Sequence, residues 1–289
     1  KIYHGIAKKL EELPFPVRCM LGILRSFSHA VNMRFHRNPG RVLFKGLRQK
    51  AGLETLRLMV SGGGPLSMET AAFFQSLGFE IRQGYGMSEN GPLITTNTLQ
   101  YYNNRSVGLP VKYTNVRIAE PDEHGVGEIQ VTSPSLMKGY FNNPEATAEV
   151  ITEDGYLRTG DLGYFDKNGF LFITGRKKNL IVTSGGKNVY PEEIEHYFYG
   201  LPYIAEVLVM GEKENDPNDE RVTATIYPDY EALKAEYGEE TLTDDFIRSR
   251  IAEQVRAVNA RLPGYKKVDT WNIREEEFSK TSSQKIKRY

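Results

Sequence analysis

The sequence predicts an α/β fold: a mainly parallel, helix-covered sheet plus an antiparallel β subdomain, followed by a small α+β C-terminal domain. Three observations lead to this prediction. Residues 56–86 pass through strand, glycine-turn, helix and strand patterns, as a βαβ unit does. Residues 108–175 consist of short alternating segments separated by turns. A second series of strand and helix patterns begins after the basic stretch 176–178.

These changes of pattern divide the chain into two expected parts. The larger part covers residues 1–175, with an α/β sheet portion at 1–107 and the β subdomain at 108–175. The smaller, mobile domain covers 176–289, which is long enough to have a core of its own. We expect the basic stretch to be the hinge between them.

In the first part, residues 1–50 have helical patterns with basic faces, interrupted at Pro14, Pro16 and Pro39. A short apolar run then predicts a buried strand that enters a glycine-rich loop. In such sheets ligands bind at the loops after the strand ends, where both glycine-rich stretches of this part lie. The expected ranges are 56–60 for the strand, 61–65 for the loop, 67–77 for a helix and 80–83 for a second strand.

Turns and caps predict the remaining elements. Residues 166–169 (Asp, Lys, Asn, Gly) between two apolar segments are typical of a hairpin. Pro191 before two glutamates and Thr243 before two aspartates are typical of helix starts. The second helix has an apolar stripe expected to be buried: Ile247, Ile251, Val255, Val258 and Leu262. The expected strands are 111–119, 128–132, 163–165, 170–174, 180–183, 204–210, 222–227 and 268–273.

The composition excludes several classes of protein. Of the 289 residues, 39% are apolar and 11% aromatic, so the chain can bury a core, which argues against disorder. The 37 basic residues balance 37 acidic ones, so net charge does not recruit nucleic acid. Residues 1–50 nevertheless carry eleven Lys and Arg against two Glu. This excess is typical of a solvated basic helix face, and contact with anionic lipid or a phosphate ligand is the alternative.

The number and spacing of particular residues exclude three further classes: disulfide-linked, zinc-binding and membrane-spanning proteins. Cys19 is the single cysteine, so no intrachain disulfide forms and a reducing compartment is expected. The five histidines never approach metal-ligand spacing. The longest early apolar stretch, residues 20–24, is too short to span a membrane. We expect a cytoplasmic protein, and peripheral contact with the inner face of the membrane stays open.

Three glycine-rich stretches are candidate ligand loops, although none matches a Walker or dinucleotide-binding pattern. The glycines at 62–64 allow close approach of a flat ring or a phosphate, and an ordinary turn is the alternative. In residues 84–89, a tyrosine between glycines can stack on a base, and the hydroxyl and carboxylate that follow can meet a phosphate oxygen and its magnesium. The alternative is a buried tyrosine followed by a helix cap.

Two further motifs are weak when taken alone. Asp161 lies between Gly160 and Gly163, where its carboxylate can accept both hydroxyls of a ribose; the alternative is an aspartate at a hairpin corner. The polar, basic tail at 279–288 has the composition of a solvated, inert segment.

In combination and in this order, the motifs resemble the AMP-forming adenylate synthetase superfamily, which includes acyl-CoA synthetases, peptide-synthetase adenylation domains and luciferases. The resemblance covers essentially residues 52–289. Within the superfamily the chain is most similar to bacterial long-chain fatty-acid–CoA ligases, chiefly through residues 175–195. Residues 1–175 would then be the C-terminal part of the large adenylate-forming domain.

The resemblance implies a role for each motif residue. Gly62, Gly63, Gly64 and Pro65 would line the adenine, Tyr85 would stack on it, and Gly84, Gly86 and Met87 would belong to the same nucleotide-binding site. Ser88 would contact the α-phosphate, Glu89 would hold magnesium, Asp161 would hold the ribose hydroxyls, and Arg176 would lie near ribose and phosphate. Lys178 would be the hinge, and Gly185, Gly186 and Lys187 would border the CoA site. Lys285 would be the catalytic lysine that bridges the substrate carboxylate and the α-phosphate during adenylation.

The sequence departs from the superfamily pattern in two places. Gln284 stands where a glycine usually precedes the catalytic lysine, which predicts a stiffer or displaced loop. The Ser/Thr/Gly-rich loop that clamps the β- and γ-phosphates of ATP is not found upstream of residues 62–64. We therefore expect a C-terminal fragment that is inactive alone.

The resemblance implies ATP-dependent activation of a fatty acid through an acyl-adenylate to an acyl-CoA, with release of AMP and pyrophosphate. Fatty acid, ATP and coenzyme A would be the substrates and Mg2+ the metal, and an oligomer is compatible with this activity. Two alternatives stay open: an enzyme that loads an acyl or amino-acid group onto a carrier protein, and a non-catalytic nucleotide-binding module. The length of the acyl chain does not follow from these residues.

Overall fold

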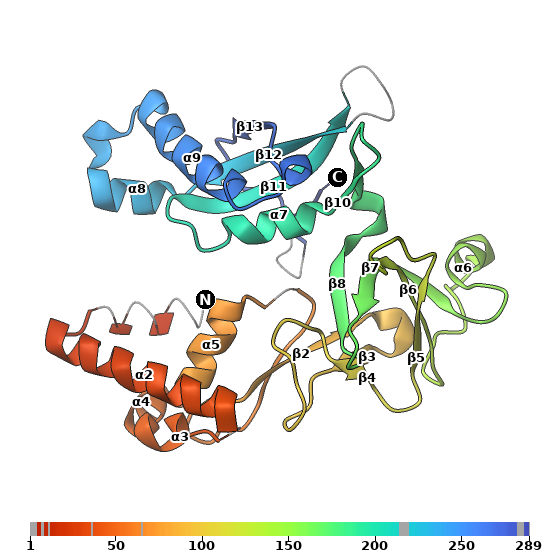
Figure 1. Cartoon of the computed structure of the whole chain (residues 1–289), viewed down its shortest axis with the longest axis horizontal. Helices are drawn as coiled ribbons and strands as arrows, with labels where there is room; N and C mark the ends of the chain where they lie inside the picture. Colours follow the sequence, from red (N-terminus) through yellow and green to blue (C-terminus); the bar gives the residue numbers. More distant parts are fainter. Residues whose placement is uncertain are drawn as a thin grey trace. The chain divides into compact units, whose positions relative to one another are not determined.

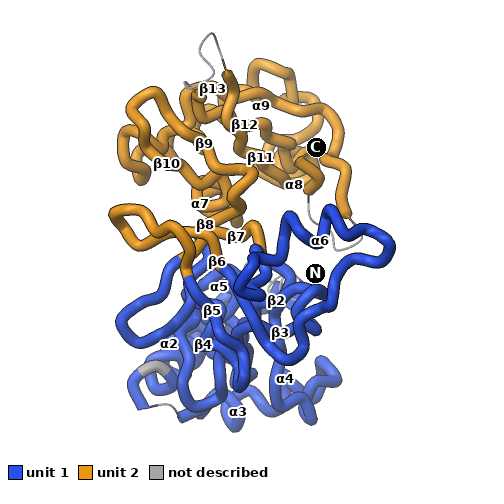
Figure 2. The backbone as a smooth tube through the Cα atoms, turned by 90° about the vertical axis from the view of Figure 1, so that its right-hand side faces the viewer, with its two compact units in different colours: residues 1–117, 130–158, 164–173 blue, residues 118–129, 159–163, 174–289 orange. Residues whose placement is uncertain are grey.

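The computed structural model describes residues 5–6, 9–10, 12–35, 37–64, 66–213, 220–281 and 286–288. The chain forms two compact units, shown in different colours in Figure 2. Unit 1 comprises residues 1–117, 130–158 and 164–173, and unit 2 comprises 118–129, 159–163 and 174–289. Both contain helices and sheets, so the predicted α/β class is confirmed. Among the described helices, none combines the length and the apolar character that a membrane crossing needs.

The helices with fully described bounds before the first sheet of unit 1 are α2 (Phe15–Phe35), α3 (Gly40–Leu43) and α4 (Lys45–Lys50). The prolines mark their starts, as the sequence predicts. Pro16 lies in the first turn of α2 and Pro39 is the N-cap of α3. Proline is tolerated there because the N–H groups of a first helical turn have no partner within the helix.

The first sheet contains β1 (Met59–Ser61), β2 (Ile81–Gly86), β3 (Leu93–Thr96) and β4 (Leu109–Pro110) in this order. β1 and β2 are parallel and are connected through α5 (Met68–Ser76), which confirms the βαβ unit. β2 pairs with β3, and β3 with β4, in antiparallel orientation. The sheet is thus mixed and not mainly parallel in these strands. The connection between β2 and β3, residues 87–92, is too short for the crossover that parallel strands require.

Aromatic packing holds the βαβ unit together. α5 begins at Ser67, whose hydroxyl accepts a hydrogen bond from the Thr70 N–H. Its Phe74 packs edge-on against Phe79, just before β2, at 5.9 Å between ring centroids. Leu21 of α2 packs against the same buried cluster, and Figure 1 shows α2 beside α5. The cluster therefore holds α5 against the beginnings of β1 and β2, at Met59 and Ile81.

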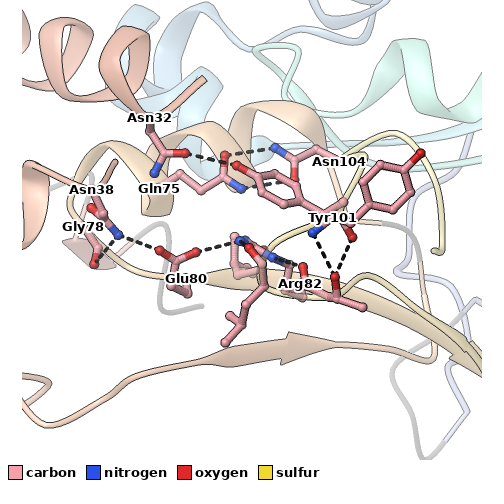
Figure 3. A network of polar contacts seen from close by, with 12 residues as sticks. Asn32, Asn38, Gln75, Gly78, Glu80, Arg82, Tyr101 and Asn104 are labelled. Atoms are coloured by element: carbon pink, nitrogen blue, oxygen red, sulfur yellow. Dashed lines mark hydrogen bonds and ion pairs between the residues drawn. The ribbon is translucent and has the colours of Figure 1, made fainter. Parts of the chain in front are cut away.

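A buried polar network ties β2 to the segment after β3 (Figure 3). Arg82 is buried, forms an ion pair with Glu80 at 2.7 Å and donates a hydrogen bond of 2.8 Å to the Thr98 carbonyl. Gln75 of α5 and Asn104 exchange side-chain hydrogen bonds of 3.1 and 2.9 Å. Because these polar groups have partners, their burial is tolerated and the beginning of β2 is held in one position.

The second sheet contains β5 (Asn115–Ala119), β6 (Gly127–Thr132), β7 (Leu157–Phe165) and β8 (Leu171–Arg176) in chain order. The predicted hairpin turn between β7 and β8 is confirmed, since the Asp166 carboxylate accepts hydrogen bonds from the N–H groups of Asn168 and Phe170. β5 begins later than the predicted residue 111, because Tyr113 has a left-handed φ of 66° that an extended strand does not allow. α6 (Pro144–Val150) is absent from the sequence prediction, since none of its residues is buried.

In unit 2, β9 (Ile181–Val182) and β10 (Asn188–Val189) form a two-stranded ribbon. β11 (Ile204–Lys213), β12 (Glu220–Pro228) and β13 (Thr270–Ile273) form a sheet with β12 in the middle. The α-helices of this unit are α7 (Pro191–Phe198), α8 (Tyr230–Tyr237) and α9 (Asp244–Asn259). It also has three short 3-10 helices among its described residues: η2 (Lys177–Asn179), η3 (Glu239–Thr241) and η4 (Gly264–Lys266). In unit 1, a short 3-10 helix, η1, covers Ser88–Asn90.

The predicted stripe of α9 is buried, and it shares one core with α7, β11 and β12. The sequence does not predict α8, because Leu233 is its only buried residue and one apolar position gives no periodic pattern.

Candidate functional site

The first glycine loop lies at the carboxyl end of β1, beside β2. Parallel pairing places Ser61 opposite Gln83, and a Cβ on Gly62 would lie 3.4 Å from the Gly84 carbonyl oxygen. Gly63 has a φ of +78°, which residues with side chains rarely adopt. The loop glycines Gly62, Gly63 and Gly64 are exposed, and Pro65 lies outside the described residues. The loop therefore presents bare backbone that a flat ring or a phosphate can approach.

Gln83 supports this loop, a role that the sequence does not indicate because a glutamine in a strand belongs to no motif. Its side chain is buried; the amide oxygen accepts a hydrogen bond of 3.3 Å from the Leu66 N–H. Its amide nitrogen donates a hydrogen bond of 2.7 Å to the Asn104 carbonyl. Gln83 thus connects the end of the glycine loop to the polar network of unit 1.

The second glycine-rich stretch is the end of β2 and the turn after it. Gly84 is half-buried, and Tyr85 is buried in the sheet opposite Thr95. A Cβ on Gly86 would overlap the Pro92 carbonyl, so this position requires glycine. Met87 is half-buried and Ser88 is exposed, and Ser88 begins η1 without a side-chain cap. Burial of Tyr85 agrees with the alternative of a buried tyrosine, whereas the capping role considered for Ser88 and Glu89 is not seen.

Glu89 is held from two sides. Its backbone carbonyl accepts a hydrogen bond of 2.7 Å from the Met137 N–H, and its carboxylate Oε1 accepts one of 3.0 Å from the Tyr140 hydroxyl. Burial, followed by this hydrogen bond to Glu89, raises the pKa of Tyr140, so the phenol stays a proton donor. The neighbouring Asn90 is fully buried and accepts a hydrogen bond from Ser133. The segment 133–140 therefore fixes a carboxylate that is suited to a magnesium ion.

The sequence does not single out Tyr140, because the partner of Glu89 lies 51 positions further along the chain. A cavity of about 580 Å³ opens beside it, lined by Lys138, Gly139, Tyr140, Asn142, Asn143, Pro144, Thr147, Ala148 and Ile151.

In unit 2, the structure brings Asp161 and Arg176 together. Arg176 Nε lies 2.7 Å from Asp161 Oδ1, and the Asp161 side chain is 11% exposed. The hairpin-corner alternative for Asp161 is wrong, because the residue lies inside strand β7. Gly160 adopts a left-handed φ of 70° without ending the strand, and the corner lies at 166–169. A paired carboxylate and guanidinium on neighbouring strands can bind a polar ligand by its hydroxyls and its charge.

The expected hinge and CoA-loop residues lie on short turns of unit 2. Lys178 is exposed in η2, whose first residue, Lys177, donates a hydrogen bond of 3.2 Å to Glu128. The predicted loop residues Gly185, Gly186 and Lys187 lie between β9 and β10, in a turn closed by the Thr183 N–H and the Lys187 carbonyl at 3.1 Å. This turn is exposed, and Gly186 has a φ of +67°. It is accessible to a large ligand.

Lys285 and Gln284 lie outside the described residues, whereas residues 279–281 and 286–288 are described. The Lys287 N–H donates a hydrogen bond of 2.8 Å to the Ser279 carbonyl, and Lys280 bridges to Ile286 in antiparallel orientation. Arg288, at 14% side-chain exposure, forms an ion pair with Glu195 at 2.6 Å. The interpretation of the tail as a solvated segment is therefore wrong for Arg288, whereas Ser279 and Lys287 are exposed.

The α/β fold and these glycine loops can now be compared with known proteins. Residues 17–141 match the family model described as AMP-binding enzyme, so the chain carries a domain of the AMP-binding enzyme family. Over 261 residues it is 32% identical to the long-chain-fatty-acid–CoA ligase ACSBG2 of Gallus gallus, a match that covers 83% of this chain and 34% of the relative. The resemblance to AMP-forming synthetases is confirmed at this level.

Two further similar proteins extend the comparison. The long-chain-fatty-acid–CoA ligase FadD15 of Mycobacterium tuberculosis is 37% identical over 191 residues, covering 66% of this chain and 30% of the relative. The O-succinylbenzoate coenzyme A synthetase MenE of Bacillus subtilis, solved with ATP and magnesium, has a TM-score of 0.65 and 28% identity, and the match covers 81% of this chain and 46% of that structure. The chain thus spans about a third of the length of the curated relatives it matches.

Proposed function

We propose that the protein to which this chain belongs is an AMP-forming long-chain fatty-acid–CoA ligase. The observation that carries the proposal is that the similarity to a long-chain ligase extends over 83% of the chain and therefore includes both units. The exposed glycine loop, the fixed carboxylate of Glu89 and the Asp161–Arg176 pair support a nucleotide substrate.

The reaction proceeds in two steps in this proposal. The fatty-acid carboxylate attacks the α-phosphate of ATP, which gives acyl-adenylate and pyrophosphate, and the CoA thiolate then displaces AMP. Glu89 would hold a magnesium ion, which would supply positive charge to neutralise the phosphates. Lys285 stabilises the same charge from the tail during the first step. Asp161 accepts hydrogen bonds from the ribose hydroxyls, and Arg176 orients that carboxylate.

Pyrophosphate exchange and CoA-dependent release of AMP by the whole enzyme test the proposal. Exchange that depends on a long-chain fatty acid, together with AMP release that depends on CoA, is the expected result. Exchange without CoA-dependent release would favour an enzyme that loads a carrier protein. Nucleotide binding without exchange in the whole enzyme would refute the proposal and leave a non-catalytic module.

We also propose that the enzyme works in the cytoplasm, in peripheral contact with an anionic membrane surface that supplies its apolar substrate. Exposed Cys19 is compatible with a reducing compartment, and the excess of basic residues in 1–50 suits anionic lipid. Cosedimentation with vesicles of anionic phospholipid, lost at high salt, is the expected result. Equal recovery with neutral vesicles would contradict it.

A further inference from the structure

Glu192 lies between two segments of unit 2 that are far apart in the sequence. It occupies the first turn of α7, where the helix dipole favours a carboxylate. Its Oε1 atom accepts a hydrogen bond of 2.6 Å from the Asn179 amide of η2, and Arg288 Nη2 of the tail lies 3.5 Å from the same oxygen. One carboxylate oxygen therefore contacts both the expected hinge turn and the C-terminal tail.

The other carboxylate oxygen is packed against the strand that leads into the hinge. Glu192 Oε2 is buried and has no hydrogen-bond partner among the described residues. A Cβ atom at position 175 would lie 2.7 Å from this oxygen. Because Gly175 has no side chain, it leaves the space that the oxygen fills. The carboxylate is thus fitted to the backbone of residues 175–179, and a shift of that backbone displaces it.

Arg288 connects the carboxylate to the end of the tail. Its Nη2 lies 2.6 Å from Glu195 Oε1, and its Nη1 donates a hydrogen bond of 2.7 Å to the Val209 carbonyl. The Val209 N–H in turn donates a hydrogen bond of 2.8 Å to Glu195 Oε1. Charge-assisted hydrogen bonds of this kind fix an arginine in both position and direction. Arg288 stands three positions after Lys285 in the sequence.

We propose that Glu192 and Arg288 are positioning residues that couple the hinge turn, residues 177–179, to the C-terminal tail next to Lys285. A change of the hinge turn moves the Glu192 carboxylate, and Arg288 transmits this movement to the tail. Lys178 of the turn and Arg288 of the tail also line one cavity of about 150 Å³, which leaves room for such a movement. The roles of Lys285 and Lys178 rest on the proposed function, whereas the coupling itself does not.

Hydrogen exchange of the 289-residue protein tests the coupling, with peptides that cover the hinge turn and the tail. Asn179→Ala removes the contact of Glu192 with the hinge without leaving an unpaired charge; it is expected to speed exchange in the tail peptide about fivefold. Arg288→Lys is expected to speed exchange in the hinge peptide by a similar factor. The matched control is Glu193→Gln, because Glu193 is the next residue of α7 and pairs with Lys266 at 2.7 Å.

Effects confined to the segment that carries each substitution would overturn the coupling, and so would equal effects of Glu193→Gln. The fluorescence of Trp271, the single tryptophan, checks that the core of unit 2 stays folded in every variant.

The half-reactions of the whole enzyme provide a second readout. Arg288→Met is expected to slow acyl-adenylate formation about tenfold with little change in the KM for ATP, and Arg288→Lys to restore part of the rate. Thioester formation from pre-made acyl-adenylate is expected to change less. Equal slowing of both half-reactions would assign Arg288 a purely structural role. If the unsubstituted enzyme showed no exchange of pyrophosphate, the proposed function would fail, and hydrogen exchange would still decide the coupling.

Discussion

The two units differ in how completely they bury their apolar side chains. In unit 2, α7, α9 and the sheet β11–β13 enclose one core, in which Ile194 and Ile251 have no exposed surface. In unit 1, α2 packs on α5 through one face only, and Ile23 and Phe27 on the same helix remain 71% and 56% exposed. Unit 2 therefore encloses its own core, whereas unit 1 keeps an open apolar helix face.

The two units also differ in how they hold their candidate site residues. Unit 1 holds its glycine loops and Glu89 by strand pairing and buried hydrogen bonds. Unit 2 carries Lys178 and Lys187 on turns outside a closed core. A domain that encloses its own core can rotate as a rigid unit without losing its packing. The proposed mechanism requires such a rotation between its two half-reactions.

The largest expected effect concerns the core of unit 2. Ile251→Ala leaves a cavity in a fully packed site, so we expect it to lower the free energy of unfolding by about 2–5 kcal/mol. Urea unfolding followed by the fluorescence of Trp271, which packs against this core, measures the loss. A loss below about 1 kcal/mol would show that the core is less closed than its burial indicates.

Two lysines of unit 2 test the proposed mechanism, in which a rotation of this unit presents them to the substrate one after the other. Lys285→Ala in the whole enzyme is expected to slow acyl-adenylate formation about 10²–10³-fold and to spare thioester formation from pre-made acyl-adenylate. Lys187→Ala is expected to do the reverse: it raises the CoA requirement and leaves pyrophosphate exchange near normal. Paired half-reaction kinetics measure both effects.

A hinge variant is the control for this pair. Lys178→Pro fixes φ at the hinge, so it is expected to block only the second half-reaction. If Lys285→Ala slowed both half-reactions equally, the two-conformation mechanism would be wrong for this protein.

Asp161 tests the nucleotide site of the proposed function. Asp161→Ala is expected to weaken binding of ATP and AMP by roughly 1.5–3 kcal/mol, the scale of charge-assisted hydrogen bonds. The fold is expected to survive, because the partner Arg176 is about half exposed and can be solvated. Titration calorimetry of the whole enzyme with AMP measures the change. If the affinity for AMP stayed unchanged, Asp161 would have only a structural role in β7.

The buried carboxyl of Glu195 makes the stability of unit 2 depend on pH. Burial raises the pKa of Glu195 from 4.5 to about 7, although Arg288 opposes the shift. Because the pKa is higher in the folded state, the stability that the protonated carboxyl contributes is fully present below about pH 4.5 and is lost as the pH rises through about 7. We expect urea unfolding to show falling stability from pH 5 to 7, with a slope of at most about 1.4 kcal/mol per pH unit from this group.

Glu195→Gln is expected to flatten this dependence, whereas Glu193→Gln is expected to keep it. If the free energy of unfolding fell equally steeply with pH in both variants, Glu195 would not be the titrating group.

The smallest expected effect concerns the open face of unit 1. Ile23→Ala removes a side chain that is 71% exposed, so the free energy of unfolding is expected to change by less than about 0.5 kcal/mol. Thermal unfolding followed by circular dichroism checks this. A loss comparable to that of Ile251→Ala would mean that the face is covered in solution and would remove the contrast between the units.

The sequence predicts elements well where a local signal is complete. The hairpin turn beginning at Asp166, the cap at Thr243 and the buried stripe of α9 all follow from residues close together in the chain. It misses α6 and α8, because few or none of their residues are buried and periodicity needs a buried face. It leaves a hairpin corner open as the alternative for Asp161 because glycines on both sides are typical of turns, whereas Gly160 is accommodated within a strand.

The family, the glycine loops and the residue types of the candidate site were determined by the sequence alone, because glycine, carboxylate and lysine at fixed spacings carry their chemistry with them. Only the tertiary structure decided which groups meet: Tyr140 with Glu89, Arg176 with Asp161, and Arg288 with Glu192 and Glu195. These partners lie between 15 and 96 positions apart in the sequence. Their distances depend on strand pairing and packing, which no local pattern specifies.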